Sequence, residues 1–243
     1  MNQNRAPDEY REYYSQDLES LSDLPNYQQW IMDNFLPYIG GHGVEFGAGM
    51  GTFSKLILPH LDKMDLVEPS PNLVIQLHNQ FQDNRVVQVI GDTVENYIHT
   101  LKDRSIDTIV FINVLEHIKD DANILRHSSR TLRSGGHLLL FVPALPFLFS
   151  NLDRVLGHYR RYLIKELHYA IQKAGFELVC SRYFDLLGIL PWWLINTIGG
   201  KRDFNQAQAR LYDRVGIPVT RFIESIAAPP VGKNIILVAR RNL

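Results

Sequence analysis

The sequence predicts an α/β fold, a doubly wound and mostly parallel seven-stranded sheet with helices on both faces. Strand and helix signals alternate along most of the 243 residues. Residues 107–112 form a nearly unbroken apolar run, which is typical of a central parallel strand. A turn with three glycines, at 47–51, follows the first predicted strand directly. Such alternation implies right-handed crossovers between parallel strands.

The first half of the chain carries three strand signals separated by helix signals. A polar arm (1–23) precedes a helix at 27–38, where apolar residues recur at helical spacing before a Gly-Gly pair. Thr52 is a suitable cap for the helix after the glycine turn. The predicted strands are 43–46, 64–67 and 86–90, and the helices between them are 52–61 and 71–81.

The second half continues the same alternation. Ser134-Gly135-Gly136 is expected to close a helix, and Pro143 to stop the strand that follows. The predicted strands are 107–112, 137–142, 176–182 and 234–240, and the predicted helices are 121–132 and 164–174.

Composition indicates a globular protein. The chain is 45% hydrophobic and 21% charged, and no apolar run approaches the roughly 20 residues of a membrane span. Cys180 is the single cysteine, which excludes an intrachain disulfide and favours a reducing compartment. The polar, acidic start resembles neither a signal peptide nor a transit peptide, so we expect a cytoplasmic location.

Charge is divided unevenly along the chain. Residues 1–150 hold 11 lysines and arginines against 19 acids, whereas residues 151–243 hold 14 against 7. This asymmetry fits a cationic cofactor on one side and an anionic or membrane-adjacent substrate on the other, and it equally fits ordinary surface variation. No basic stripe with interleaved aromatic residues points to nucleic acid.

The glycine turn predicts which nucleotide binds. Thr52 stands where the third glycine of a dinucleotide fingerprint is required. Glu45 places an acid two residues before the first glycine, where it would repel a pyrophosphate and attract a cationic amino acid tail. S-adenosylmethionine (SAM) has such a tail, and we expect it to contact Glu45, Gly47, Ala48, Gly49 and Gly51.

Polar residues after the next two strands extend this site. Glu68, with Pro69, lies roughly 20 residues after the turn, the distance at which an acid meets a ribose. Asp92 is a candidate acceptor for the adenine amino group, with Thr93 beside it. The alternatives are a solvent-facing loop acid at Glu68 and a helix cap at Asp92-Thr93.

The segment after the fourth strand is where cofactor and substrate should meet. Asn113 and Val114 are placed to bind the methionine end, and Leu115 to pack on the adenine. His117 is a candidate general base, and the alternative is a structural histidine bonded to backbone.

Residues 157–162, Gly-His-Tyr-Arg-Arg-Tyr, are dense in polar and aromatic types. His158 is the second candidate base, and Tyr159, Arg160, Arg161 and Tyr162 are candidate substrate contacts. The alternative is a helix entry whose charges face solvent.

The most apolar stretch, 186–195, includes Trp192 as a candidate substrate contact. It fits a lid over an apolar pocket, an element touching lipid headgroups, or a buried helix. No metal site is expected, because the histidines lack zinc-type spacing with acids and one cysteine excludes thiolate clusters.

These motifs together resemble the class I SAM-dependent methyltransferases, over roughly residues 25–182 and the last strand. The resemblance rests on residues 45–51, Glu68-Pro69-Ser70, Gly91-Asp92 and residues 113–118. Val142-Pro143-Ala144 and residues 157–162 are similar to those of a bacterial small-molecule subgroup. Many members have cysteine or serine at the position of Ala48, where alanine offers only its backbone.

The resemblance implies a last strand that runs antiparallel beside 176–182, and a division of the chain into four parts. Residues 1–40 form an arm and helix that cover the cofactor, with Tyr14 as a candidate substrate contact. Residues 41–183 form the SAM-binding core, 184–230 a substrate-side insertion or lid, and 231–243 the last strand.

The predicted activity is transfer of the SAM methyl group to an oxygen, nitrogen or carbon of a small molecule, such as a sugar, lipid-linked or natural-product acceptor. S-adenosylhomocysteine would be the product. Two alternatives remain open from sequence, an NAD-dependent oxidoreductase on a similar sheet and a non-catalytic SAM-binding module.

Overall fold

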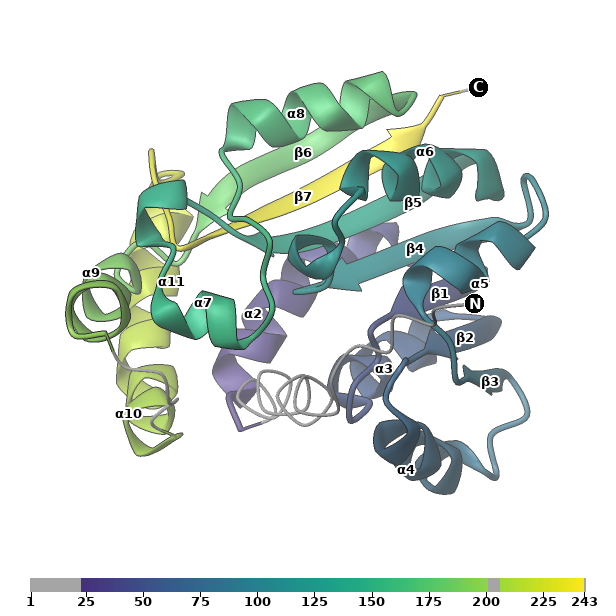
Figure 1. Cartoon of the computed structure of the whole chain (residues 1–243), viewed down its shortest axis with the longest axis horizontal. Helices are drawn as coiled ribbons and strands as arrows, with labels where there is room; N and C mark the ends of the chain where they lie inside the picture. Colours follow the sequence, from purple (N-terminus) through teal and green to yellow (C-terminus); the bar gives the residue numbers. More distant parts are fainter. Residues whose placement is uncertain (1–22, 201–205, 243) are drawn as a thin grey trace, which may run out of the picture.

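The seven strands form one sheet with the order β3-β2-β1-β4-β5-β7-β6 (Figure 1). The computed structural model describes residues 23–200 and 206–242. The last strand, β7, runs antiparallel to both of its neighbours, as expected. The strands are β1 (His42–Phe46), β2 (Lys63–Val67), β3 (Val87–Ile90), β4 (Ile106–Ile112), β5 (Leu132–Pro143), β6 (Phe176–Phe184) and β7 (Asn234–Arg241).

Helices cover both faces of the sheet, and each face has its own apolar core (Figure 1). The helices on one face are α5 (Val94–Thr100), α6 (Asp121–Thr131) and α8 (Ile164–Lys173). The opposite face is covered by α2 (Pro25–Phe35), α3 (Thr52–Ile57) and α4 (Pro71–Phe81). The doubly wound architecture predicted from the alternating pattern is therefore confirmed.

Most predicted boundaries differ by a few residues, and two of the differences have a local cause. The predicted helix 52–61 is α at Thr52–Ile57 and 3₁₀ at Leu58–His60, since Pro59 has no amide hydrogen to donate to an α-helical turn. Ser134-Gly135-Gly136 does not cap α6 but lies inside β5, which begins at Leu132. Gly135 has a φ of +80°, so the strand kinks there.

The described residues between β6 and β7, 185–200 and 206–233, are largely helical, and this segment is here called the insertion. Its described elements are α9 (Ile189–Trp192), a π-helical segment (Trp193–Ile198), α10 (Gln206–Leu211), a second π-helical segment (Tyr212–Gly216) and α11 (Ile217–Ile226). Figure 1 shows α9, α10 and α11 at the left, the side at which the parallel strands end. Among the described residues, no helix combines the length and the apolar character that crossing a bilayer requires.

The insertion is joined to α2 by buried polar contacts. Asp213 accepts hydrogen bonds from the amides of Asn26 and Tyr27, at 3.2 and 2.8 Å. Asp185, which is fully buried, bonds the hydroxyls of Tyr27 and Tyr212. Tyr27 is thereby a core residue that fixes the insertion to the sheet.

Candidate active site

The turn after β1 has the backbone conformation that glycine favours. Gly47, Gly49 and Gly51 have φ values of +67°, +55° and +76°, in the left-handed region. A Cβ at Gly47 would collide with a methyl group of Val114. The turn therefore lies directly against the segment that follows β4, bringing together two predicted parts of the site.

Glu68 is fixed at the end of β2 by two backbone amides. Its Oε2 accepts from Gly49 and its Oε1 accepts from Ser70, both at 2.9 Å. The carboxylate therefore lies against the glycine turn, and it is not a solvent-facing loop acid. Each oxygen keeps a second lone pair, which suits the two hydroxyls of a ribose.

Glu45 lies before the turn, at the end of β1, and its surroundings differ from those of Glu68. Its side chain is buried and accepts a hydrogen bond of 2.5 Å from Ser54 on α3. Burial raises the pKa of Glu45 to about 8, reinforced by the charge of Glu68 and only partly offset by Ser54. Glu45 is thus protonated near neutral pH in this structure, and a cationic group nearby would favour its ionised form.

Asp92 and Thr93 form the start of α5. Thr93 accepts from the amide of Asn96 at 3.3 Å, so it caps the helix. Asp92 Oδ1 accepts from the amide of Thr93 and from the side chain of Asn96, at 2.8 and 2.9 Å. Thr93 therefore has the capping role named as the alternative, and contact of Asp92 with adenine stays a prediction.

The three residues after β4, Asn113, Val114 and Leu115, lie beside the glycine turn and the core. Asn113 has a φ of +51°, and its amide donates to Phe141 at 2.8 Å. Val114 meets the glycine turn, Leu115 is fully buried, and both belong to the core on the α5 side. Packing of Leu115 on adenine stays a prediction.

The two candidate bases lie together. The rings of His117 and His158 are 4.6 Å apart and perpendicular. His158 Nδ1 lies 3.0 Å from Asp153 Oδ1. A carboxylate only accepts, so Nδ1 carries the hydrogen, and in the neutral ring the lone pair is then on Nε2.

Asp153 is fixed by its own surroundings. Burial alone would raise its pKa, but the hydrogen bond from His158 and the charge of Arg161 lower the pKa to about 2. Asp153 also closes a capping box with Ser150 at the start of α7 (Asn151–Val155). The Ser-x-x-Asp spacing at 150–153 is the signal from which this cap was predictable.

Three of the residues in 157–162 are fixed by contacts with the starts of α6 and α7. Arg160 pairs with Asp121 at 2.8 Å, and Arg161 pairs with Asp153 at 2.8 Å. The Tyr162 hydroxyl donates to Asp121. Tyr159 is exposed, so of the four predicted substrate contacts here it alone presents most of its side chain to solvent.

Glu116 belongs to the sequence motif at 113–118 but has no predicted role, and the structure brings it into the site. It is fully buried in the 3₁₀ turn Leu115–His117. Its backbone oxygen accepts from the amide of Tyr159 at 2.8 Å, which ties the two histidine segments together. Sequence spacing gave no signal for this contact, because the two segments are distant along the chain.

The insertion adds an apolar surface beside these groups. Trp192 donates to the backbone oxygen of Leu148 at 3.1 Å and packs under Arg161. Leu190 and Trp193 are partly or largely exposed, so the alternative of a buried helix is wrong. A pocket of about 630 Å³ is lined by Phe147, Leu186, Leu187, Ile189, Leu190, Pro191 and Trp193. Tyr14 lies outside the described residues.

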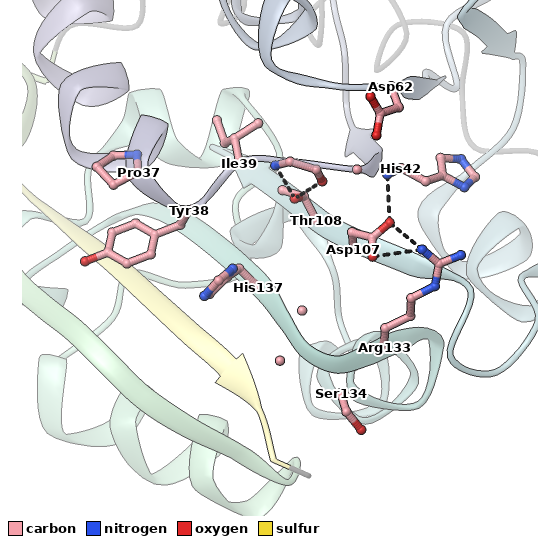
Figure 2. Close-up of a pocket in the computed structure, with 14 residues that line it drawn as sticks. Pro37, Tyr38, Ile39, His42, Asp62, Asp107, Thr108, Arg133, Ser134 and His137 are labelled. Atoms are coloured by element: carbon pink, nitrogen blue, oxygen red, sulfur yellow. Dashed lines mark hydrogen bonds and ion pairs between the residues drawn. The ribbon is translucent and has the colours of Figure 1, made fainter.

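A pocket of about 660 Å³ lies at the opposite edge of the sheet, where the parallel strands begin (Figure 2). There Asp107 accepts from the amide of His42 and pairs with Arg133. Ligands of doubly wound sheets bind at the carboxyl ends of the strands, so this pocket is not part of the predicted site.

The residues at the carboxyl edge fit SAM. Two buried acids, Glu45 and Glu68, lie against the glycine turn, and both oxygens of Glu68 keep a lone pair beside their amide hydrogen bonds. Such a site suits a ligand that carries a ribose and positive charge.

Comparisons with known proteins agree. A family model described as a methyltransferase domain matches residues 11–181. The human thiol S-methyltransferase TMT1A is 31% identical over 113 residues, covering 44% of this chain and 46% of its own. An uncharacterized 37.1 kDa protein in a Streptomyces fradiae transposon is 29% identical over 145 residues, covering 57% and 40%. The chain therefore spans less than half the length of these two curated relatives.

The fold matches as well. A SAM-dependent methyltransferase structure from Archaeoglobus fulgidus aligns with a TM-score of 0.60 and 15% identity, over 86% of this chain and 91% of that one. The family match covers most of the core that the sequence motifs marked out. This chain therefore belongs to the methyltransferase-domain family and has the fold of the class I SAM-dependent methyltransferases.

Proposed function

We propose that this protein transfers the methyl group of SAM to a small-molecule acceptor. The observation that carries the proposal is the Glu68 carboxylate, held against the glycine turn by the amides of Gly49 and Ser70. It is supported by the family match and by the class I fold.

SAM, when bound, supplies a methyl group on a positively charged sulfur. The protein then needs to bind and orient both reactants and exclude water. Glu68 would hold the ribose, Glu45 would favour the cationic tail, and Val114 would pack beside the turn. The other predicted cofactor contacts are Gly47, Ala48, Gly51, Pro69, Asp92, Thr93, Asn113 and Leu115.

An acceptor hydroxyl, thiol or ammonium group must lose a proton. We assign this role to His158, because Asp153 fixes its Nδ1 hydrogen and leaves Nε2 to receive a proton. His117, 4.6 Å away between ring centres, is the second candidate.

The acceptor is expected to carry an apolar part. The pocket around Trp193 is lined by apolar side chains, and it belongs to the insertion at the carboxyl edge. The same exposed surface suits peripheral contact with a membrane that holds a lipid-linked acceptor. The similarity to a thiol S-methyltransferase makes apolar thiols the first acceptors to test. A cytoplasmic location fits the lone cysteine.

Calorimetry with SAM tests the cofactor site. We expect one SAM per chain for the wild type, and no measurable binding for Glu68→Ala or Gly49→Val. Circular dichroism confirms that each variant is folded. Undiminished SAM affinity in both folded variants would refute the assignment.

Two further measurements separate the alternatives. A rise in melting temperature with SAM or S-adenosylhomocysteine, and none with NAD, excludes the oxidoreductase. Mass spectrometry then detects methylated product from a panel of thiols, phenols and amines. A non-catalytic SAM-binding module would bind SAM and give no product with any member of the panel.

A further inference from the structure

Three metal-ligating side chains converge at the carboxyl edge of β4. Among the described residues, Glu116, His117 and His158 each offer a ligand atom, and these atoms lie within 4.8 Å of one another. Two ligands of one ion at about 2.0–2.2 Å are separated by up to roughly 4.4 Å. A small rotation of the side chains is therefore enough to surround a single ion.

His158 is oriented as metal-binding histidines are. Its Nδ1 donates to Asp153 at 3.0 Å, so Nε2 carries the lone pair of the neutral ring. The carboxylate of Asp153 is itself held by Ser150 and Arg161. A histidine whose second nitrogen bonds a fixed carboxylate is the usual outer arrangement at metal sites.

The two segments that carry these ligands are fastened to each other. The amide of Tyr159 donates to the Glu116 backbone at 2.8 Å, and Arg160 pairs with Asp121 at 2.8 Å. The His158 side chain is only 6% exposed. The ligands are therefore gathered before any ion arrives, which lowers the entropic cost of binding one.

We propose that Glu116, His117 and His158 bind one divalent transition-metal ion. Two imidazoles and one carboxylate suit Zn²⁺, Fe²⁺ or Co²⁺ better than Mg²⁺ or Ca²⁺, which prefer oxygen ligands. Three protein ligands leave at least one coordination position open.

Two of the three side chains, Glu116 and His117, lie close along the chain to the place where a methyl acceptor is expected. Val114, two residues before Glu116, meets the glycine turn. An acceptor oxygen or sulfur would bind the ion there, and this part of the inference rests on the proposed function. His158 Nε2 would then be a ligand in place of a base. The proposal departs from the sequence expectation of no metal site, which considered spacing along the chain, whereas His158 lies in a different segment from Glu116 and His117.

Calorimetry of the chelator-treated full chain with ZnCl₂, in the absence of SAM, tests the site. We expect one Zn²⁺ per chain. His117→Ala and His158→Ala should each lower Zn²⁺ affinity at least about 100-fold, and Asp153→Asn about 10- to 100-fold. Circular dichroism checks folding of each variant.

His127→Ala is the matched control. His127 and His99 form a similar perpendicular pair, with ring centres 4.1 Å apart, on α6 and α5. We expect Zn²⁺ affinity to be unchanged in this variant. The unmodified chain with Co²⁺ gives a second readout, visible absorption bands of nitrogen-bound Co²⁺, which needs no variant to fold.

Absence of Zn²⁺ binding by the wild type, or equal affinity in the wild type and both folded histidine variants, would overturn the proposal. SAM binding measured on the same protein keeps the two proposals separate. Zn²⁺ binding without SAM binding refutes the proposed function alone, and SAM binding without Zn²⁺ binding refutes the ion site alone.

Discussion

At the residue scale, the two acids around the glycine turn have different surroundings. Burial raises the pKa of both. Glu68 is stabilised as a carboxylate by two amide hydrogen bonds, whereas Glu45 has one hydroxyl partner. We therefore expect Glu68 to bind hydroxyl groups, and Glu45 to couple cofactor binding to pH.

The pKa of Glu45, about 8, predicts proton release when SAM binds at pH 7. The free protein holds the proton below pH 8, and the cationic ligand favours the carboxylate. SAM affinity should therefore rise with pH, by at most tenfold per unit, and level off above about pH 8. Calorimetry in two buffers of different ionisation enthalpy measures the released proton.

Glu45→Gln is the control for this prediction. The amide cannot ionise, so its SAM affinity should be weaker and its proton release absent. Equal proton release by the wild type and Glu45→Gln would show that another group titrates.

Gly47 gives a prediction about backbone strain. Alanine at this position would hold a φ near +67° and would collide with Val114. We expect Gly47→Ala to lower the free energy of unfolding by about 1–3 kcal/mol and to weaken SAM binding. Urea denaturation and calorimetry measure the two effects. Gly135→Ala is the control, since its φ is +80° but a Cβ there meets no atom within 4 Å.

At the element scale, α2 depends on a residue far away in the sequence. Its own N-cap position, Leu24, makes no side-chain hydrogen bond. The Asp213 carboxylate, from the insertion, accepts from the first amides of the helix instead. Asp213 is buried. Because it lies at the start of α2, its carboxylate is at the positive end of the helix dipole.

Asp213→Ala is therefore expected to destabilise the protein by about 1–3 kcal/mol, because it leaves buried amides without their acceptor. Urea denaturation measures the loss. Asp23→Ala is a matched control, since Asp23 pairs with Arg210 across the same two segments but is half exposed. That variant should change stability by less than about 1 kcal/mol. Equal losses in the two variants would contradict the capping role.

At the scale of the whole molecule, every predicted cofactor contact lies at one edge of the sheet. The loops after β1, β2, β3 and β4 all follow the carboxyl ends of parallel strands. The polar pocket drawn in Figure 2 lies at the other edge of the sheet. The topology of the sheet therefore predicts that the cofactor binds at the carboxyl edge and not in the pocket of Figure 2.

Amide hydrogen exchange with and without SAM tests this choice of edge. We expect slower exchange in residues 47–51, 68–70 and 113–117 when SAM is bound. Residues 37–42 and 133–137, which line the pocket of Figure 2, should exchange at unchanged rates. Protection confined to those last two segments would place the ligand at the wrong end of the sheet.

The sequence by itself determined the order and type of most elements, because apolar periodicity and glycine or proline boundaries are local properties. It also marked the glycine turn and Glu68, since motifs that follow strands meet at one edge of a parallel sheet. Only the tertiary structure decided that Asp213 caps α2, that Asp153 bonds His158, and that the backbone of Glu116 bonds Tyr159. Those contacts join residues that are far apart along the chain or on different elements, and packing between elements leaves no period or spacing in the sequence from which to predict it.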